Sequence, residues 1–123
     1  MIWTIWVGIG AFLAAAAVAT GAFGAHALQQ RLSPDALALW EVACRYHMYH
    51  ALGLLGCGLV GTRIDSYLLH IAALLIFLGV LAFSGSLYAY VFLPLRWLMY
   101  LTPLGGACMI LGWILLGVSV IRG

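Results

Sequence analysis

Four long apolar stretches, separated by short polar segments, cover almost the whole chain of 123 residues. They run over residues 2–27, 34–61, 66–92 and 103–121, and each is near the roughly 20 residues that a helix needs to cross about 30 Å of hydrocarbon. Because the connections are short, successive helices should be antiparallel neighbours. The pattern therefore predicts a single all-α membrane domain, in which four transmembrane helices form an antiparallel bundle.

Polar residues mark where two of these helices should begin. Ser33 can cap the second helix, with Pro34 at its first position and Asp35 in its first turn. Thr102-Pro103 repeats this pattern and predicts that the fourth helix begins at residue 103. Its free amide groups would then lie beside Gly105 and could hold an anion, although an ordinary helix cap explains the same residues.

The composition excludes several classes of protein. Hydrophobic residues make up 67% of the chain and charged residues only 7%, which is too apolar for a water-soluble domain. There is no lysine and no basic cluster, so nucleic-acid binding is not expected. The three cysteines lie in apolar stretches without CxxC spacing and read as small buried hydrophobes. The first apolar run exceeds a signal sequence in length and lacks a basic leader, so we interpret it as a retained helix.

Small residues recur every four positions in the first two helices. Gly10 and Ala14 form one such row, Ala17, Gly21 and Ala25 form a second, and Gly53, Cys57 and Gly61 form a third in the second helix. In lipid, rows of small residues let helices approach closely. The first two helices should therefore pack tightly, and rows left exposed would suit a homo-oligomer or a larger membrane complex.

The polar side chains gather at one membrane face. An antiparallel bundle brings together the end of the first helix, the start of the second, the end of the third and the start of the fourth. In the second helix, Glu41 and Arg45 are four residues apart and could pair, and His47 and His50 share one side. In the third, Ser84-Gly85-Ser86 should interrupt the helix. The candidate ligand-binding residues at this face are His26, Glu41, Arg45, His47, His50, Ser84, Ser86, Tyr88, Thr102 and Gly105.

Ionisable groups at membrane depth are costly, and they usually face the bundle interior or a functional site. The histidines could simply tie helices together by hydrogen bonds. Alternatively, His26, His47 and His50 could ligate a haem iron or another metal, although no metal-binding signature is present. A third hypothesis is a proton-coupled transporter or channel, which would need an oligomer to form a continuous path. The sequence specifies no cofactor and no catalytic set.

Four short motifs in order carry a family resemblance: GAFGAHAL at 21–28, YHMYHALG at 46–53, FSGSLY at 83–88 and TPLGG at 102–106. Together they resemble the YgdD/YwdK-type domain-of-unknown-function family of small bacterial inner-membrane proteins, over essentially the whole chain. The resemblance implies a four-span protein of the bacterial cell membrane and brings no established activity with it. We therefore expect a non-enzymatic accessory protein, or one that binds a small ligand or membrane lipid in a polar His/Ser pocket at one membrane face.

Overall fold

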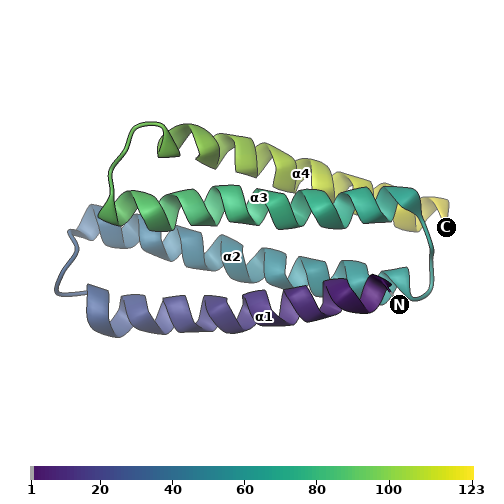
Figure 1. Cartoon of the computed structure of the whole chain (residues 1–123), viewed down its shortest axis with the longest axis horizontal. Helices are drawn as coiled ribbons and strands as arrows, with labels where there is room; N and C mark the ends of the chain where they lie inside the picture. The colour runs from purple at the N-terminus through teal and green to yellow at the C-terminus, as the bar shows by residue number, and fades with distance from the viewer. Residues whose placement is uncertain (1) are drawn as a thin grey trace.

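The computed structural model describes residues 2–123 as helices joined by short turns (Figure 1). Helix α1 spans Ile2–Phe23 and continues into a single π-helical turn, η1, at Gly24–Leu28. Helices α2, α3 and α4 span Pro34–Gly61, Tyr67–Phe92 and Leu98–Arg122. The connections 29–33 and 93–97 lie at one end, which we call the loop end, while the described start of α1 and the C-terminus lie at the other.

Three segments are long and apolar enough to cross a membrane: Ile2–Leu28, Tyr67–Phe92 and Leu98–Arg122. This confirms the all-helical prediction and three of the four expected spans. Helix α2 has the predicted bounds, with Ser33 accepting a hydrogen bond from the Ala36 amide, but it does not meet the same criterion. The physical reason is its content of Arg45, His47, His50 and acidic residues, which lower its apolar character.

The predicted start of the last helix was wrong. Helix α4 begins at Leu98 rather than residue 103, so Pro103 lies inside the helix. The turn before α4 is made by Pro94 and its neighbours, and residues 97–102 already have helical conformation or cap it. Thr102 and Gly105 therefore do not open a helix, and the expected anion site on free amides is not formed.

Glycines set two close helix contacts. Between α1 and α2, a Cβ at Gly10 would lie 2.7 Å from the Ala51 carbonyl oxygen, and one at Gly58 would lie 2.8 Å from the Trp3 carbonyl oxygen. Between α3 and α4, a Cβ at Gly105 would lie 2.5 Å from the Phe83 amide nitrogen. Such distances leave no room for a side chain, so the backbones touch. The tight antiparallel pairing of the first two helices is confirmed.

The tightly packed interior is built by α1, α2 and α3. A fully buried cluster joins these helices and contains Trp3, Leu54, Cys57, Leu69, Ala73 and Ile76. Helix α4 packs closely on α3 but touches α2 at few points. Large apolar side chains such as Phe12, Leu52, Leu81 and Ile110 are exposed on all four helices, as expected for a protein surrounded by lipid.

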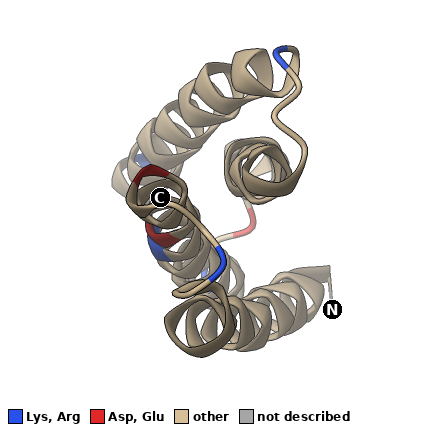
Figure 2. Ribbon diagram, turned by 90° about the vertical axis from the view of Figure 1, so that its left-hand side faces the viewer, with Lys and Arg blue, Asp and Glu red and all other residues tan. Residues whose placement is uncertain are grey.

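Charged residues are few, and their positions are visible from the loop end (Figure 2). Arg31, Arg63 and Arg96 lie in connections, and Arg122 ends α4. The charges inside a helix body belong to α2. Helix α2 is therefore the element that carries charge into the protein near the loop end.

Candidate functional site

The predicted site residues do not form one pocket. The structure divides His47, Tyr88, Glu41, Arg45 and His50 among three places: a hydrogen-bonded group between α1, α2 and α3, a cleft between η1 and α2, and a groove between α2 and α4. Each place offers different chemistry, and each has neighbours that the sequence did not identify.

The hydrogen-bonded group, which we call the polar network, joins three helices through Thr20, Tyr88 and His47. The Tyr88 hydroxyl lies 3.0 Å from the Thr20 hydroxyl and 2.9 Å from Nδ1 of His47. Nearby, the Cys44 thiol lies 3.5 Å from the hydroxyl oxygen of Thr20, and the Trp40 indole donates to the backbone carbonyl of Thr20 at 2.9 Å. The network ties α1, α2 and α3 together by polar contacts inside an apolar protein.

One arrangement of protons satisfies most of this network. The Thr20 hydroxyl donates to the Ala17 carbonyl at 3.1 Å, so its oxygen is left to accept from Tyr88. Tyr88 then accepts from Nδ1–H of His47. Nε2 of His47 is a bare acceptor in this arrangement, and it is buried without a hydrogen-bond partner among residues 2–123. The reverse arrangement, in which Tyr88 donates to Nδ1 and Nε2 carries the proton, keeps the same contact between His47 and Tyr88.

The predicted serines act as links between helices. Ser84 donates to the Ala43 carbonyl at 2.8 Å, which joins α3 to α2. The Ser86 hydroxyl lies 2.6 Å from that of Thr102, which joins α3 to α4. The expected interruption at Ser84-Gly85-Ser86 was wrong, because α3 is continuous there. The hydroxyls bond to carbonyls and to each other, so the helix needs no break to satisfy them.

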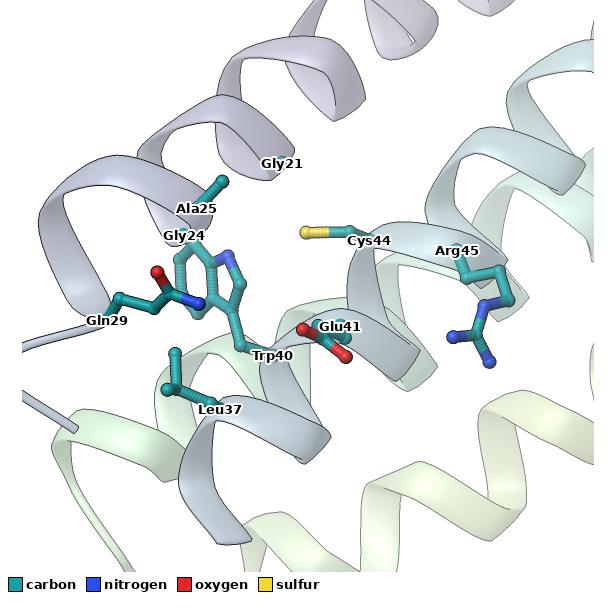
Figure 3. A pocket seen from close by; sticks show the side chains of 9 residues that line it. All are labelled: Gly21, Gly24, Ala25, Gln29, Leu37, Trp40, Glu41, Cys44 and Arg45. Carbon is teal, nitrogen blue, oxygen red and sulfur yellow. The ribbon is translucent and has the colours of Figure 1, made fainter. Parts of the chain in front are cut away.

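The cleft between η1 and α2 is the most polar of the three places (Figure 3). It has a volume of about 220 Å³. Its wall on α1 and η1 is made of small residues, and its wall on α2 carries an aromatic ring, a thiol and two opposite charges. The lining residues are Gly21, Gly24, Ala25, Gln29, Leu37, Trp40, Glu41, Cys44 and Arg45.

Glu41 and Arg45 do not pair with each other. Both side chains are exposed, and no ion pair joins them; among the described residues, the one contact of this kind is between His70 and Asp65, 3.8 Å apart near the termini. The expected neutralisation within α2 was therefore wrong. Figure 3 shows the carboxylate and the guanidinium lying apart along the cleft. The gain from such a surface pair is small, so the two charges remain open to another partner.

Trp40 gives the cleft its shape. Its indole is buried, and a Cβ at Gly24 would lie 2.5 Å from two atoms of the ring. The ring also contacts Tyr88 and Phe92 of α3, with ring centres 4.6 and 5.8 Å away. The bare glycine of η1 is therefore what allows Trp40 to reach the Thr20 carbonyl. π-Helical turns are often found at functional sites, and here the turn forms one wall of the cleft.

The groove between α2 and α4 is larger and mostly apolar, with a volume of about 560 Å³. Its wall includes His50, whose Nδ1 donates to the Tyr46 carbonyl at 2.6 Å, and whose ring lies 5.9 Å from that of Trp113. Helix α3 contributes Phe83. The complete lining is Tyr46, Tyr49, His50, Phe83, Gly106, Met109, Ile110 and Trp113.

The other predicted site residues stand apart from these three places. His26 is exposed on η1. Gly105 lies in the close contact between α3 and α4, where its Cα faces the backbone of α3. No group of three or more His, Cys, Asp or Glu side chains within residues 2–123 could hold a metal ion. The described residues therefore do not bring His26, His47 and His50 together as one metal site.

Sequence reasoning missed Thr20, Trp40 and Cys44. A signal was present, because Trp40, Cys44 and His47 follow the i, i+4, i+7 spacing of one helix face. A tryptophan on the same face as a histidine needs a partner for its N–H when buried. Only the fold, however, could supply Thr20 as that partner, since it is 20 residues away on α1.

Comparison with known proteins matches most of the chain to one family of membrane proteins. The model of the family described as "Protein of unknown function (DUF423)" matches residues 20–106. The chain is 43% identical over 119 residues to a UPF0382 membrane protein of Staphylococcus epidermidis, covering 96% of each chain. It is 45% identical over 115 residues to UPF0382 membrane protein SAB0533 of Staphylococcus aureus, covering 93% of each. It is also 36% identical over 119 residues to UPF0382 membrane protein YwdK of Bacillus subtilis, covering 96% of this chain and 97% of YwdK.

No solved structure matches the chain. The relatives are named membrane proteins, and three of the helices here could span a bilayer. The chain is accordingly an integral membrane protein, and the bacterial relatives agree with a bacterial origin.

Proposed function

Because this chain belongs to the DUF423 family of membrane proteins, we propose that it is a non-enzymatic accessory protein of the bacterial cell membrane that binds a phospholipid headgroup in the cleft between η1 and α2. The observation that carries the proposal is the pair of unpaired opposite charges, Glu41 and Arg45, beside the cleft's apolar wall.

The proposal includes α2 as a fourth span. Helix α2 lies along α1 from the Trp40 contact with Thr20 at one end to the contact of Gly58 with Trp3 at the other. Since α2 packs along the length of a candidate span, we expect it to cross the same bilayer. With 28 residues, α2 is about 42 Å long, which exceeds the roughly 30 Å of hydrocarbon. Its histidines are turned inward, which lowers the cost of placing them at that depth.

The position of the cleft suits a headgroup. Glu41 is seven residues from Pro34, or about 10 Å along the helix axis, which places it near the boundary of the hydrocarbon. Arg45 is one turn deeper, and its long side chain can extend back toward the headgroup layer. A guanidinium binds phosphate by charge-assisted hydrogen bonds, and a carboxylate binds an ammonium group. Leu37 and Trp40 would contact the glycerol and first methylene groups.

The spanning prediction can be tested by site-directed labelling. Single cysteines placed at residues 30 and 95 should react with an impermeant maleimide from one side of the membrane, and cysteines at residues 64 and 123 from the other. The native cysteines would first be replaced by alanine. If residues 30 and 64 reacted from the same side, α2 would not cross the membrane.

Headgroup binding can be tested by native mass spectrometry of the purified protein in mild detergent with added lipid. We expect retained phosphatidylethanolamine with the unaltered protein, and roughly tenfold weaker retention with Arg45→Gln, because one charge-assisted contact to phosphate is lost. Glu41→Gln should weaken phosphatidylethanolamine but not phosphatidylglycerol, which has no ammonium group.

Matched controls exist at the far end of the protein. Arg122→Gln and Asp65→Asn make the same charge changes away from the cleft. The proposal would be refuted if Arg45→Gln retained lipid as the unaltered protein does, or if Arg122→Gln lowered retention equally. In the second case, lipid would be held by net charge and not by the cleft.

A further inference from the structure

A second binding place lies in the groove between α2 and α4, on a different side of α2 from the cleft. Its wall on α4 runs from Gly106 to Trp113, in the middle of the candidate span Leu98–Arg122, so the groove opens within the hydrocarbon layer. Two of its lining rings, Tyr46 and Tyr49, are exposed, so the groove is open from the side. A molecule that enters it must already be dissolved in the membrane.

The hydrogen bond of His50 fixes the character of its ring. A carbonyl oxygen can only accept, so Nδ1 carries the proton that is donated to Tyr46 at 2.6 Å. In the neutral ring, Nε2 is then an acceptor. No hydrogen bond to this nitrogen is recorded within residues 2–123. The ring lines the groove, which therefore contains an acceptor in otherwise apolar surroundings and favours a ligand that donates a hydrogen bond.

The walls of the groove indicate the shape of that ligand. Tyr46, Tyr49, Phe83 and Trp113 place four aromatic rings around His50, and Met109 adds a thioether. Aromatic rings bind another ring by offset or edge-to-face contact, and sulfur also contacts ring edges favourably. The ring of Tyr46 already lies 4.9 Å from that of Phe83, so the walls are held by packing between α2 and α3.

We infer that this groove binds a membrane-dissolved aromatic alcohol, a phenol or quinol with an apolar tail, whose hydroxyl donates to Nε2 of His50. The ring would lie among the aromatic side chains, and the tail would leave through the open side into lipid. The groove is separate from the headgroup cleft, and its ligand does not depend on Glu41 or Arg45.

The glycines of α4 provide a sharp test. Gly106 lines the groove, and a Cβ there would meet only the Phe83 ring, at 3.8 and 4.0 Å. Gly106→Leu should therefore fill the groove without disturbing the helix contacts. Gly117→Leu is the matched control, because nothing lies within 4 Å of its Cβ position. His50→Phe removes the acceptor and keeps a ring of similar size.

The measurement is saturable binding of tritiated 4-dodecylphenol to the protein in nanodiscs, with empty nanodiscs subtracted, compared with its methyl ether. The ether keeps the ring and tail but cannot donate a hydrogen bond. We expect the phenol to bind roughly threefold to tenfold more tightly than the ether, the usual range for a hydrogen bond between groups in a membrane. His50→Phe should remove this preference, Gly106→Leu should abolish binding of both, and Gly117→Leu should bind as the unaltered protein does.

Equal binding of phenol and ether by the unaltered protein would overturn the inference, as would undiminished binding by Gly106→Leu. Size-exclusion chromatography and circular dichroism would establish that the Gly106 variant is folded. Arg45→Gln should leave phenol binding unchanged, so failure here and failure of the headgroup proposal are distinguishable.

Discussion

The contact between Gly24 and Trp40 makes one substitution especially informative. Gly24→Ala adds a single methyl group on η1, and this group would lie 2.5 Å from Cδ1 and Nε1 of the indole. Ordinary contacts between such atoms are about 3.5–4.0 Å. The ring must therefore retreat by about 1 Å, which lengthens or breaks its hydrogen bond to the Thr20 carbonyl.

The expected cost can be worked from these contacts. Overpacking a filled position costs about 1–3 kcal/mol, and loss of the indole hydrogen bond adds about 1 kcal/mol. The greater helix propensity of alanine returns about 0.5–1 kcal/mol. We therefore expect Gly24→Ala to lower the free energy of unfolding by about 2 kcal/mol. Gly21→Ala, one turn earlier with open space around its Cβ position, should be neutral or slightly stabilising.

Unfolding in mixed micelles, followed by circular dichroism at 222 nm against the mole fraction of sodium dodecyl sulfate, would measure both variants. A Trp40→Leu background provides the decisive comparison, because the shorter side chain leaves room for the new methyl group. Gly24→Ala should then cost little. If the penalty were unchanged in that background, or if Gly21→Ala were equally destabilising, the Gly24–Trp40 contact would not be the cause.

Two further substitutions test other contacts by the same assay. Tyr88→Phe removes the hydroxyl that bonds to both Thr20 and His47. It should destabilise the protein by about 1 kcal/mol, because each of two hydrogen bonds within a membrane is worth about 0.6 kcal/mol. The control Tyr67→Phe changes an exposed ring and should have no measurable effect. Gly105→Leu should separate α4 from α3 and prevent stable folding, while Gly117→Leu on the same helix should fold normally; a stable Gly105 variant would contradict the close backbone contact.

The sequence predicted the helices well because their signals are local. Length and apolar character mark each span, and the Ser33-Pro34 start of α2 was confirmed to the residue. The Thr102-Pro103 start failed although it has the same local signature. Leu98, Met99 and Leu101, which precede that proline, are good helix formers, and Pro103, the sixth residue of α4, removes one backbone hydrogen bond of the helix. Local patterns therefore could not decide between Leu98 and residue 103.

The candidate site was harder to predict because it depends on which face of each helix meets which neighbour. The sequence predicted that His47, His50 and Tyr88 lie at one membrane face, but it could not show that they belong to two separate sites. In the structure, His47 and Tyr88 bond to each other, while His50 faces α4. The residue that contacts Gly53 also could not be predicted from the sequence. Its row of small residues predicted contact with α1, yet its Cβ position meets Trp113 of α4 at 2.9 Å.

The unequal packing of α4 explains why the groove exists. Glycines at 79, 105 and 112 bring α4 directly against α3, and this close approach fixes the line along which α4 runs. On its other side, α4 meets α2 through Trp113, whose large ring lies against Gly53 and His50 and spaces the two helices. The indole fills the space between α2 and α4 at this level, and it forms one wall of the groove together with Tyr46 and His50 of α2. The same side chain that limits contact between α2 and α4 therefore forms part of the wall that could bind a ligand.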